Sequence, residues 1–126
     1  VYTVHNPAWG DGMGASLSCG LRWLCDNGHT PSGVFIMTID QPLIQPAHFE
    51  NLYTTSVREH SSVLTTDNTA DGPPAYLVKK DYLKLMSLQK DEGAKKYIGP
   101  YSTVKIAPDL FTDIDTQDAL DSLKEI

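Results

Sequence analysis

The sequence predicts a single α/β domain in which short strands alternate with helices. The chain has 126 residues, and a domain usually comprises about 100 to 200 residues. Apolar runs of strand length alternate along it with segments whose apolar residues recur at the spacing of a helix face. No internal repeat, linker or low-complexity tract interrupts this alternation. Residues 1–126 are therefore expected to form one layered α/β unit.

Strands are expected where short apolar segments are bounded by turn residues. The clearest is the nearly all-apolar run at residues 34–39, because a strand buried on both faces is typical of the centre of a parallel sheet. The polar stretch at 67–74, which contains Gly72, Pro73 and Pro74, is expected to be a loop. The other expected strands are residues 1–4, 62–66, 75–78 and 103–106.

The first expected helix carries signals at both ends. Ser16 is a candidate N-cap, and Gly28 is placed to end the helix. Between them, Leu17, Leu21 and Leu24 recur at helical spacing. A helix is therefore expected between these two residues.

A second helix is expected to begin at Pro46, since proline suits the first helical position. Its spacing predicts that one apolar face carries the buried side chains. The residues of that face are Phe49, Leu52, Tyr53 and Val57.

Three further helices are expected in the second half of the chain. Residues 81–88 carry apolar side chains at helical spacing, and a short helix is expected to start at Asp91. Thr116 is expected to cap the terminal helix. Leu120 and Leu123 would then face inward.

The composition limits the classes of partner. Sixteen acidic and ten basic side chains give a formal charge of −6, whereas a generic nucleic-acid binder needs a basic face. No apolar run approaches the roughly 20 residues of a membrane-spanning helix. We therefore expect neither nucleic acid nor a membrane as a partner.

The two cysteines indicate a cytoplasmic location. Cys19 and Cys25 lie on the first expected helix, so their Cα atoms should be about 9 Å apart, too far for a disulfide. Free cysteines are typical small core residues. The four histidines show no metal-ligand spacing, and no zinc pattern occurs.

Asp40 is the strongest single candidate for chemistry. An apolar strand would deliver this carboxylate to the carboxyl end of a sheet, where ligands of open α/β folds bind. A carboxylate there can hold Mg²⁺, which prefers one or two carboxylates together with water and phosphates. Turn chemistry explains Asp40 equally well, because Pro42 follows it.

A second acidic pair stands before the terminal helix. Asp113 and Asp115 alternate in an extended segment, so their side chains would face the same way. An acidic loop followed by the capping Thr116 is the simpler interpretation of this segment alone. If Asp40 and this acidic pair are both metal ligands, they could converge on one metal ion.

The third candidate is the glycine-rich loop at residues 10–14. Gly10, Gly12 and Ala15 match the letters of a dinucleotide-binding fingerprint, but the expected strand does not directly precede them. Backbone N–H groups that lead into a helix can also contact an anion or a substrate. A glycine-rich surface turn is a comparable alternative.

Four segments in this order resemble the second half of a molybdenum cofactor cytidylyltransferase or a close nucleotidyltransferase relative. They are GMGASL at residues 12–17, DQPL at 40–43, DEGAK at 91–95 and DIDTQDAL at 113–120. The resemblance covers nearly the whole chain. It implies a Rossmann-like three-layer α/β/α sandwich with a mostly parallel sheet that lacks its N-terminal strands.

The resemblance also implies an activity. Such enzymes transfer CMP, or another NMP, from CTP or another NTP to a phosphorylated acceptor, here a molybdopterin or molybdenum cofactor, and release pyrophosphate. The implied cofactor is Mg²⁺. The implied catalytic carboxylates and metal ligands are Asp40 and Asp115, with Asp113 as a further metal ligand.

Substrate contacts are implied in the same way. The loop from Gly12 to Ser16 would contact the acceptor, and the segment with Gly72 and Pro74 would lie on the acceptor side. At Pro73 this chain departs from the family, which has a polar residue there. The implied substrate-binding residues are Asn6, Gly12, Met13, Ser16, Gln41, Pro42, Gly72 and Pro74.

One family motif is absent. The family opens with a glycine-rich loop that ends in Arg-x-Gly-x-Pro-Lys and holds the triphosphate, and nothing in the sequence matches it. The chain alone is therefore expected to have little activity. A sheet edge would also be exposed, and either a missing N-terminal segment or a second copy in a homodimer is expected to cover it. Two alternatives stay open: a non-catalytic binding or scaffold module, and a dinucleotide-binding enzyme.

Overall fold

The computed structural model describes residues 1–88, 93–111 and 113–124, so the start of the helix expected at Asp91 lies outside the described residues. The chain forms two compact units. Unit 1 comprises Val1–Val34 and Leu77–Tyr101, and unit 2 comprises Phe35–Tyr76 and Ser102–Ile126.

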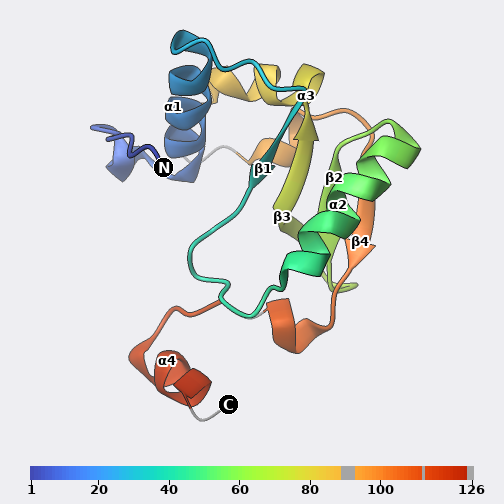
Figure 1. The fold of residues 1–126 in the computed structure, drawn as a ribbon. Helices are drawn as coiled ribbons and strands as arrows, with labels where there is room; N and C mark the ends of the chain where they lie inside the picture. Colours follow the sequence, from blue (N-terminus) through green and yellow to red (C-terminus); the bar gives the residue numbers. More distant parts are fainter. Residues whose placement is uncertain (89–92, 112, 125–126) are drawn as a thin grey trace. The chain divides into compact units, whose positions relative to one another are not determined.

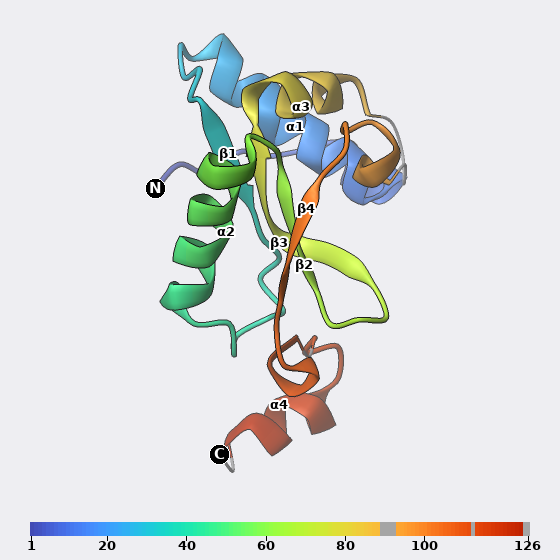
Figure 2. The same cartoon turned by 90° about the vertical axis from the view of Figure 1, so that its right-hand side faces the viewer.

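The elements alternate along the chain as the sequence predicts, and Figures 1 and 2 show the ribbon in two views. The helices are α1 (Met13–Asp26), α2 (Pro46–Glu59), α3 (Lys79–Lys84) and α4 (Gln117–Lys124). The strands are β1 (Gly33–Ile36), β2 (Val63–Thr66), β3 (Asp71–Val78) and β4 (Ser102–Lys105). Short 3₁₀ turns are η1 (Trp9–Asp11), η2 (Leu85–Ser87), η3 (Ala94–Lys96) and η4 (Pro108–Phe111).

The four strands form one mixed sheet in the order β1-β3-β2-β4. Strand β2 pairs antiparallel with β3 and parallel with β4. The α/β class is therefore confirmed. Among the described residues no helix is both long and apolar enough to cross a membrane.

The strand expected at residues 34–39 is shorter than predicted. It ends at Ile36, and in the described sheet it has β3 as its only neighbour. Phe35, Met37 and Ile39 are exposed, so the prediction of a central strand buried on both faces is wrong for the described structure. An apolar run of this length cannot say how many neighbouring strands cover it.

Strand β3 is longer than predicted, because it begins at Asp71 within the expected loop. Leu64 lies opposite Ala75 but Thr65 lies opposite Gly72, so Pro73 and Pro74 form a bulge. Proline has no N–H to donate to a sheet, and a bulge is one of the places where a strand tolerates it. The sequence analysis predicted a loop for these residues, and that prediction is wrong because the bulge lets both prolines lie within β3.

In unit 1, helix α1 begins four residues earlier than expected. Gly12 stands at the N-cap with a φ of 120°, and Ser16 lies in the first turn, so Ser16 is not the cap. Gly28 follows the helix with a φ of +79°, which confirms the predicted end. Residues 1–4 form no strand in the described sheet, and the Tyr2 ring instead lies 5.0 Å from that of Trp23.

The core of unit 1 joins α1 to the segment from α3 to η2 (Figure 1). Ser18 donates a hydrogen bond to the Met86 carbonyl oxygen at 2.7 Å. The Tyr82 hydroxyl donates to the Pro31 carbonyl oxygen, and Asp81 accepts from the Gly99 N–H at 3.2 Å. The buried apolar residues of this unit are Leu21, Leu77, Tyr82, Leu85 and Leu88.

In unit 2, helix α2 packs against β2 and β4. Pro46 opens the helix as predicted, and Leu52 is fully buried. Tyr53 and Val57 are exposed, so the predicted apolar face is only partly correct. The buried positions include the polar residues His48, Thr55 and Ser56.

The terminal helix of unit 2 begins as predicted. The Thr116 hydroxyl accepts a hydrogen bond from the Ala119 N–H at 3.1 Å, which confirms the cap. No described residue of α4 is buried, and Leu120 is exposed. The inward face expected for Leu120 and Leu123 is therefore not buried by the described chain.

A buried hydrogen-bond chain joins α2 to the bulge. The Thr65 hydroxyl donates its only hydrogen to the Pro74 carbonyl oxygen at 2.6 Å. His48 Nε2 lies 2.7 Å from the same hydroxyl oxygen, so Nε2 must be the donor in that bond. Burial lowers the pKa of His48 below its ordinary value of 6.5, because a charged imidazole would lose hydration.

We expect the free energy of unfolding to fall as the pH is lowered through 6.5. Below that value the unfolded chain binds a proton at His48 that the folded chain does not, and the loss is complete below the lowered pKa of the folded form. Urea unfolding from about pH 7.5 to about pH 5 measures it. His48→Gln keeps a donor for Thr65 without titrating in this range, so it should flatten the dependence.

His5→Gln, at an exposed histidine, is the matched control and should leave the pH dependence unchanged. If the His48→Gln variant keeps the full dependence, another group causes it.

Candidate functional site

Asp40 and Gln41 carry the orphaned polar atoms of unit 2. Asp40 lies in the turn after β1, four residues beyond Ile36. Its Oδ1 and the Oε1 of Gln41 are buried and have no hydrogen-bond partner among the described residues. Leaving such a group unpaired costs about 1–3 kcal/mol. Orphaned oxygens on two successive residues therefore mark a candidate ligand site.

The main chain brings the second acidic segment to Asp40. The N–H of Ile114 donates to the Asp40 carbonyl oxygen at 2.8 Å, and Figure 1 shows the two segments meeting. Ile114 is flanked by Asp113 and Asp115, whose side chains are both exposed. Candidate carboxylates from distant parts of the sequence thus lie on touching segments of unit 2.

These residues can be tested against a magnesium ion. Among the described residues, no group of three histidines, cysteines or carboxylates could hold a metal, so Asp40, Asp113 and Asp115 do not form such a set. Mg²⁺ needs only one or two carboxylates, because water and phosphate oxygens complete its shell. Asp40 and one carboxylate of the neighbouring segment would supply that number of carboxylates, and the ion would give the orphaned Oδ1 of Asp40 a partner.

The remaining predicted residues of unit 2 differ in accessibility. Pro42 is exposed, and Gly72 is half-buried where β3 pairs with Thr65. Pro74 is fully buried, and its carbonyl oxygen accepts from Thr65. The Pro74 side chain therefore supports the strand in this structure and is not presented to a substrate.

In unit 1, the predicted acceptor residues gather at the start of α1. Asn6 donates through Nδ2 to the Ser16 hydroxyl at 3.0 Å and accepts from the Ala8 N–H through Oδ1, also at 3.0 Å. Gly12 has a φ of 120°, a conformation that side chains rarely adopt. Met13 is 67% exposed. The loop is thus held by its own hydrogen bonds and presents Met13 outward.

A cavity of about 420 Å³ lies beside this loop in unit 1. Its lining includes Asn6, Asp11 and Arg22, together with η2 and the residue that follows it. Sequence reasoning missed Arg22, because no motif surrounds it. The available signal is its spacing of seven residues from Ala15, which places both on one face of α1.

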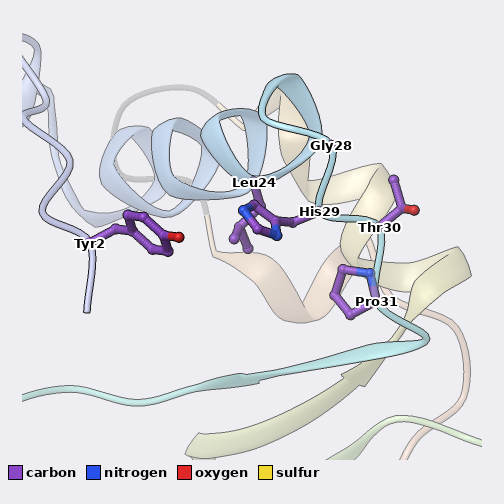
Figure 3. A pocket seen from close by; sticks show the side chains of 6 residues that line it. All are labelled: Tyr2, Leu24, Gly28, His29, Thr30 and Pro31. Atoms are coloured by element: carbon purple, nitrogen blue, oxygen red, sulfur yellow. The ribbon is translucent and has the colours of Figure 1, made fainter.

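A larger cavity of about 510 Å³ lies at the other end of α1 (Figure 3). Figure 3 shows the Tyr2 ring on one side, Pro31 on the other and the His29 ring between them. His29 also stacks on Trp23 with ring centroids 6.0 Å apart. No aspartate, glutamate, lysine or arginine lines this cavity, so it does not suit a phosphorylated substrate.

Comparison with known proteins identifies a family. The model of the MobA-like NTP transferase domain matches residues 1–105. No curated protein matches the sequence.

Two solved structures share the fold. The homologue of Mycobacterium tuberculosis rv0371c from Mycobacterium sp. strain JC1 is 23% identical with a TM-score of 0.65, and 86% of this chain covers 55% of that one. Molybdopterin-guanine dinucleotide biosynthesis protein A from Archaeoglobus fulgidus is 17% identical with a TM-score of 0.64, and 90% of this chain covers 62% of that one. The chain thus spans little more than half the length of these structures.

The two likenesses confirm the predicted α/β fold at low sequence identity. The family model extends over more than four fifths of the sequence and includes Asn6, Arg22 and Asp40. The chain belongs to the MobA-like NTP transferase domain family.

Proposed function

We propose that this chain is part of a Mg²⁺-dependent nucleotidyltransferase that transfers CMP, or another NMP, to a molybdopterin-type acceptor. The observation that supports it best is the orphaned Oδ1 of Asp40 beside the segment of Asp113 and Asp115. Family membership supplies the nucleotide class of substrate. The Archaeoglobus protein's name, which refers to molybdopterin-guanine dinucleotide, supports the class of acceptor.

The proposed reaction is a phosphoryl-centred displacement. A phosphate oxygen of the acceptor attacks the α-phosphorus of the NTP, a new P–O bond forms, and the bond from the α-phosphorus to the bridging oxygen breaks. Pyrophosphate leaves with that oxygen. Catalysis of this kind depends on positioning and on neutralising charge at the phosphoryl oxygens.

The carboxylates of unit 2 have the metal-binding role. Mg²⁺, when bound, would neutralise charge on the phosphoryl oxygens and orient them. Asp40 would hold the ion together with Asp115, with Asp113 as the other candidate on the same segment. The hydrogen bond from the Ile114 N–H holds the main chain that carries the Asp40 carboxylate.

The loop before α1 has the acceptor-binding role. Asn6 already bonds Ser16 and Ala8, so the loop loses little freedom when a ligand binds. Gly12 leaves the backbone open to close approach. CTP is the favoured donor because the GMGASL and DEGAK segments resemble those of cytidylyltransferases. The name of the Archaeoglobus protein refers to guanine, so GTP is the competing donor.

Metal binding is expected to depend on Asp40. Mn²⁺, used as a spectroscopic substitute for Mg²⁺, should bind the chain, and Asp40→Asn should weaken it at least about tenfold, because one of two carboxylate ligands loses its charge. Electron paramagnetic resonance of free Mn²⁺ measures the affinity. Asp115→Asn should weaken binding more than Asp113→Asn.

Glu50→Gln is the charge-matched control for this titration, since Glu50 is exposed on α2 of the same unit. Equal Mn²⁺ affinity in the Asp40→Asn and Glu50→Gln variants would contradict the proposed metal site and favour the alternative of a non-catalytic binding module.

Nucleotide transfer is the direct test, made with the full protein that contains this chain. Pyrophosphate release with a molybdopterin acceptor should be faster with CTP than with GTP or ATP. Asp40→Asn should slow it at least about 100-fold, comparable to the loss of a group that stabilises transition-state charge.

Release that is faster with GTP would reverse the choice of base and keep the reaction class. No release with any NTP, while the protein still binds Mn²⁺, would overturn the proposed activity.

A further inference from the structure

The 420 Å³ cavity of unit 1 holds two unpaired charges of opposite sign. Asp11 and Arg22 both line it, and neither side chain makes a hydrogen bond or ion pair with any described residue. The only other arginine of the sequence, Arg58, pairs with Glu59 at 3.0 Å. A guanidinium and a carboxylate that share a cavity without pairing can each bind a different part of one ligand.

The rest of the lining is mostly apolar. Ala8 and Ala15 contribute methyl groups from the loop and from α1, and Met86 and Leu88 contribute larger side chains. Only Asn6 and Ser87 add uncharged polar groups. Apolar walls with a few polar groups are typical of small-molecule sites, whose volumes run from about 300 to about 1,000 Å³. The lining therefore suits an organic body with a charged substituent.

The walls are held in place by contacts within unit 1. Met86 accepts a hydrogen bond from Ser18 through its carbonyl oxygen, and its Sδ lies 3.7 Å from the Sγ of Cys25. Arg22 stands four residues after Ser18 and so lies on the same face of α1. Asp11 is fixed by η1, where its N–H donates to the Ala8 carbonyl oxygen at 2.9 Å. The two charges are thus carried by ordered elements.

We propose that this cavity, the Asp11–Arg22 pocket, binds the pterin and phosphate of the acceptor. Arg22 would form paired hydrogen bonds with the phosphate, a geometry that the planar guanidinium favours. Asp11 would accept two N–H groups from the aminopyrimidinone edge of the pterin, since an ionised carboxylate accepts on both oxygens. Asp11 would also repel the phosphate, so the charges orient the ligand.

The pocket is continuous with the predicted acceptor loop. Asn6 lines the pocket and also donates to Ser16, one of the predicted substrate-binding residues. The inference rests on the proposed function for the class of acceptor, but its residues are new to that proposal. A purely local role for Asp11 is to stabilise the N-terminus of α1 through the helix dipole. That role would affect the melting temperature and not the choice of ligand.

The test uses the intrinsic fluorescence of two probes, 6-hydroxymethylpterin and its phosphate monoester. The wild-type chain should bind the monoester about tenfold more tightly, or better, because of the charge-assisted bond to Arg22. Arg22→Gln should remove this preference, and Arg22→Lys should retain part of it. Asp11→Asn should weaken both probes about equally, since it acts on the shared pterin edge.

Arg58→Gln is the matched control and should leave both affinities unchanged. Thermal melts followed by circular dichroism confirm that the exposed-site variants Asp11→Asn and Arg22→Gln are folded. A preference for the monoester that survives in Arg22→Gln would overturn the inference, and so would a wild-type chain that binds neither probe. Neither result would decide the proposed function, which the Mn²⁺ titration and the pyrophosphate-release assay test independently.

Discussion

The hydroxyl group of Thr65 joins three elements of unit 2, and the site depends on that junction. It donates to Pro74 in the bulge of β3 and accepts from His48 in the first turn of α2. Thr65 is fully buried, so a replacement that lacks the hydroxyl would leave both partners unpaired at once. The start of α2 also ends the loop that carries Asp40. One buried hydroxyl thus anchors both the irregular strand and the far end of the candidate metal loop.

The electrostatics of unit 2 explain why a cation suits this site better than a direct phosphate contact. Asp40 offers a buried oxygen without a partner, and the neighbouring segment adds Asp113 and Asp115. The whole chain carries a formal charge of −6. A triphosphate that approached these carboxylates unaccompanied would be repelled, whereas a divalent ion between them reverses the sign of the interaction.

Sequence analysis succeeded where the cause was local. Pro46, Gly28 and Thr116 mark helix ends through their own backbone or hydroxyl chemistry, and each stands where it was predicted. It failed where a distant residue decides. Pro73 and Pro74 lie within β3 because the pairing with β2 skips them: Leu64 pairs with Ala75 and Thr65 pairs with Gly72.

The same distinction separates the two halves of the candidate site. Asp40 stands out in the sequence because a strand-like run leads into it, although β1 ends three residues earlier than that run suggested. The role of Asp115 came from family resemblance, and its convergence with Asp40 needs the Ile114 hydrogen bond, which no spacing encodes. Arg22 was not predicted, because its spacing from Ala15 marks only a helix face and its cavity forms where η2 packs on α1.

The two units divide the chemistry by charge. Unit 2 contributes carboxylates, which suit a metal and the phosphoryl group that the metal accompanies. The cavity of unit 1 contributes the Arg22 guanidinium and the Asp11 carboxylate, which suit a ligand with an anionic and a hydrogen-donating end. A metal ion by itself would neutralise the reacting phosphates of any nucleoside triphosphate and any phosphorylated acceptor. If the proposed function holds, the choice of acceptor would come from groups such as Arg22 and Asp11, since a planar guanidinium and a carboxylate can discriminate between ligands of equal charge.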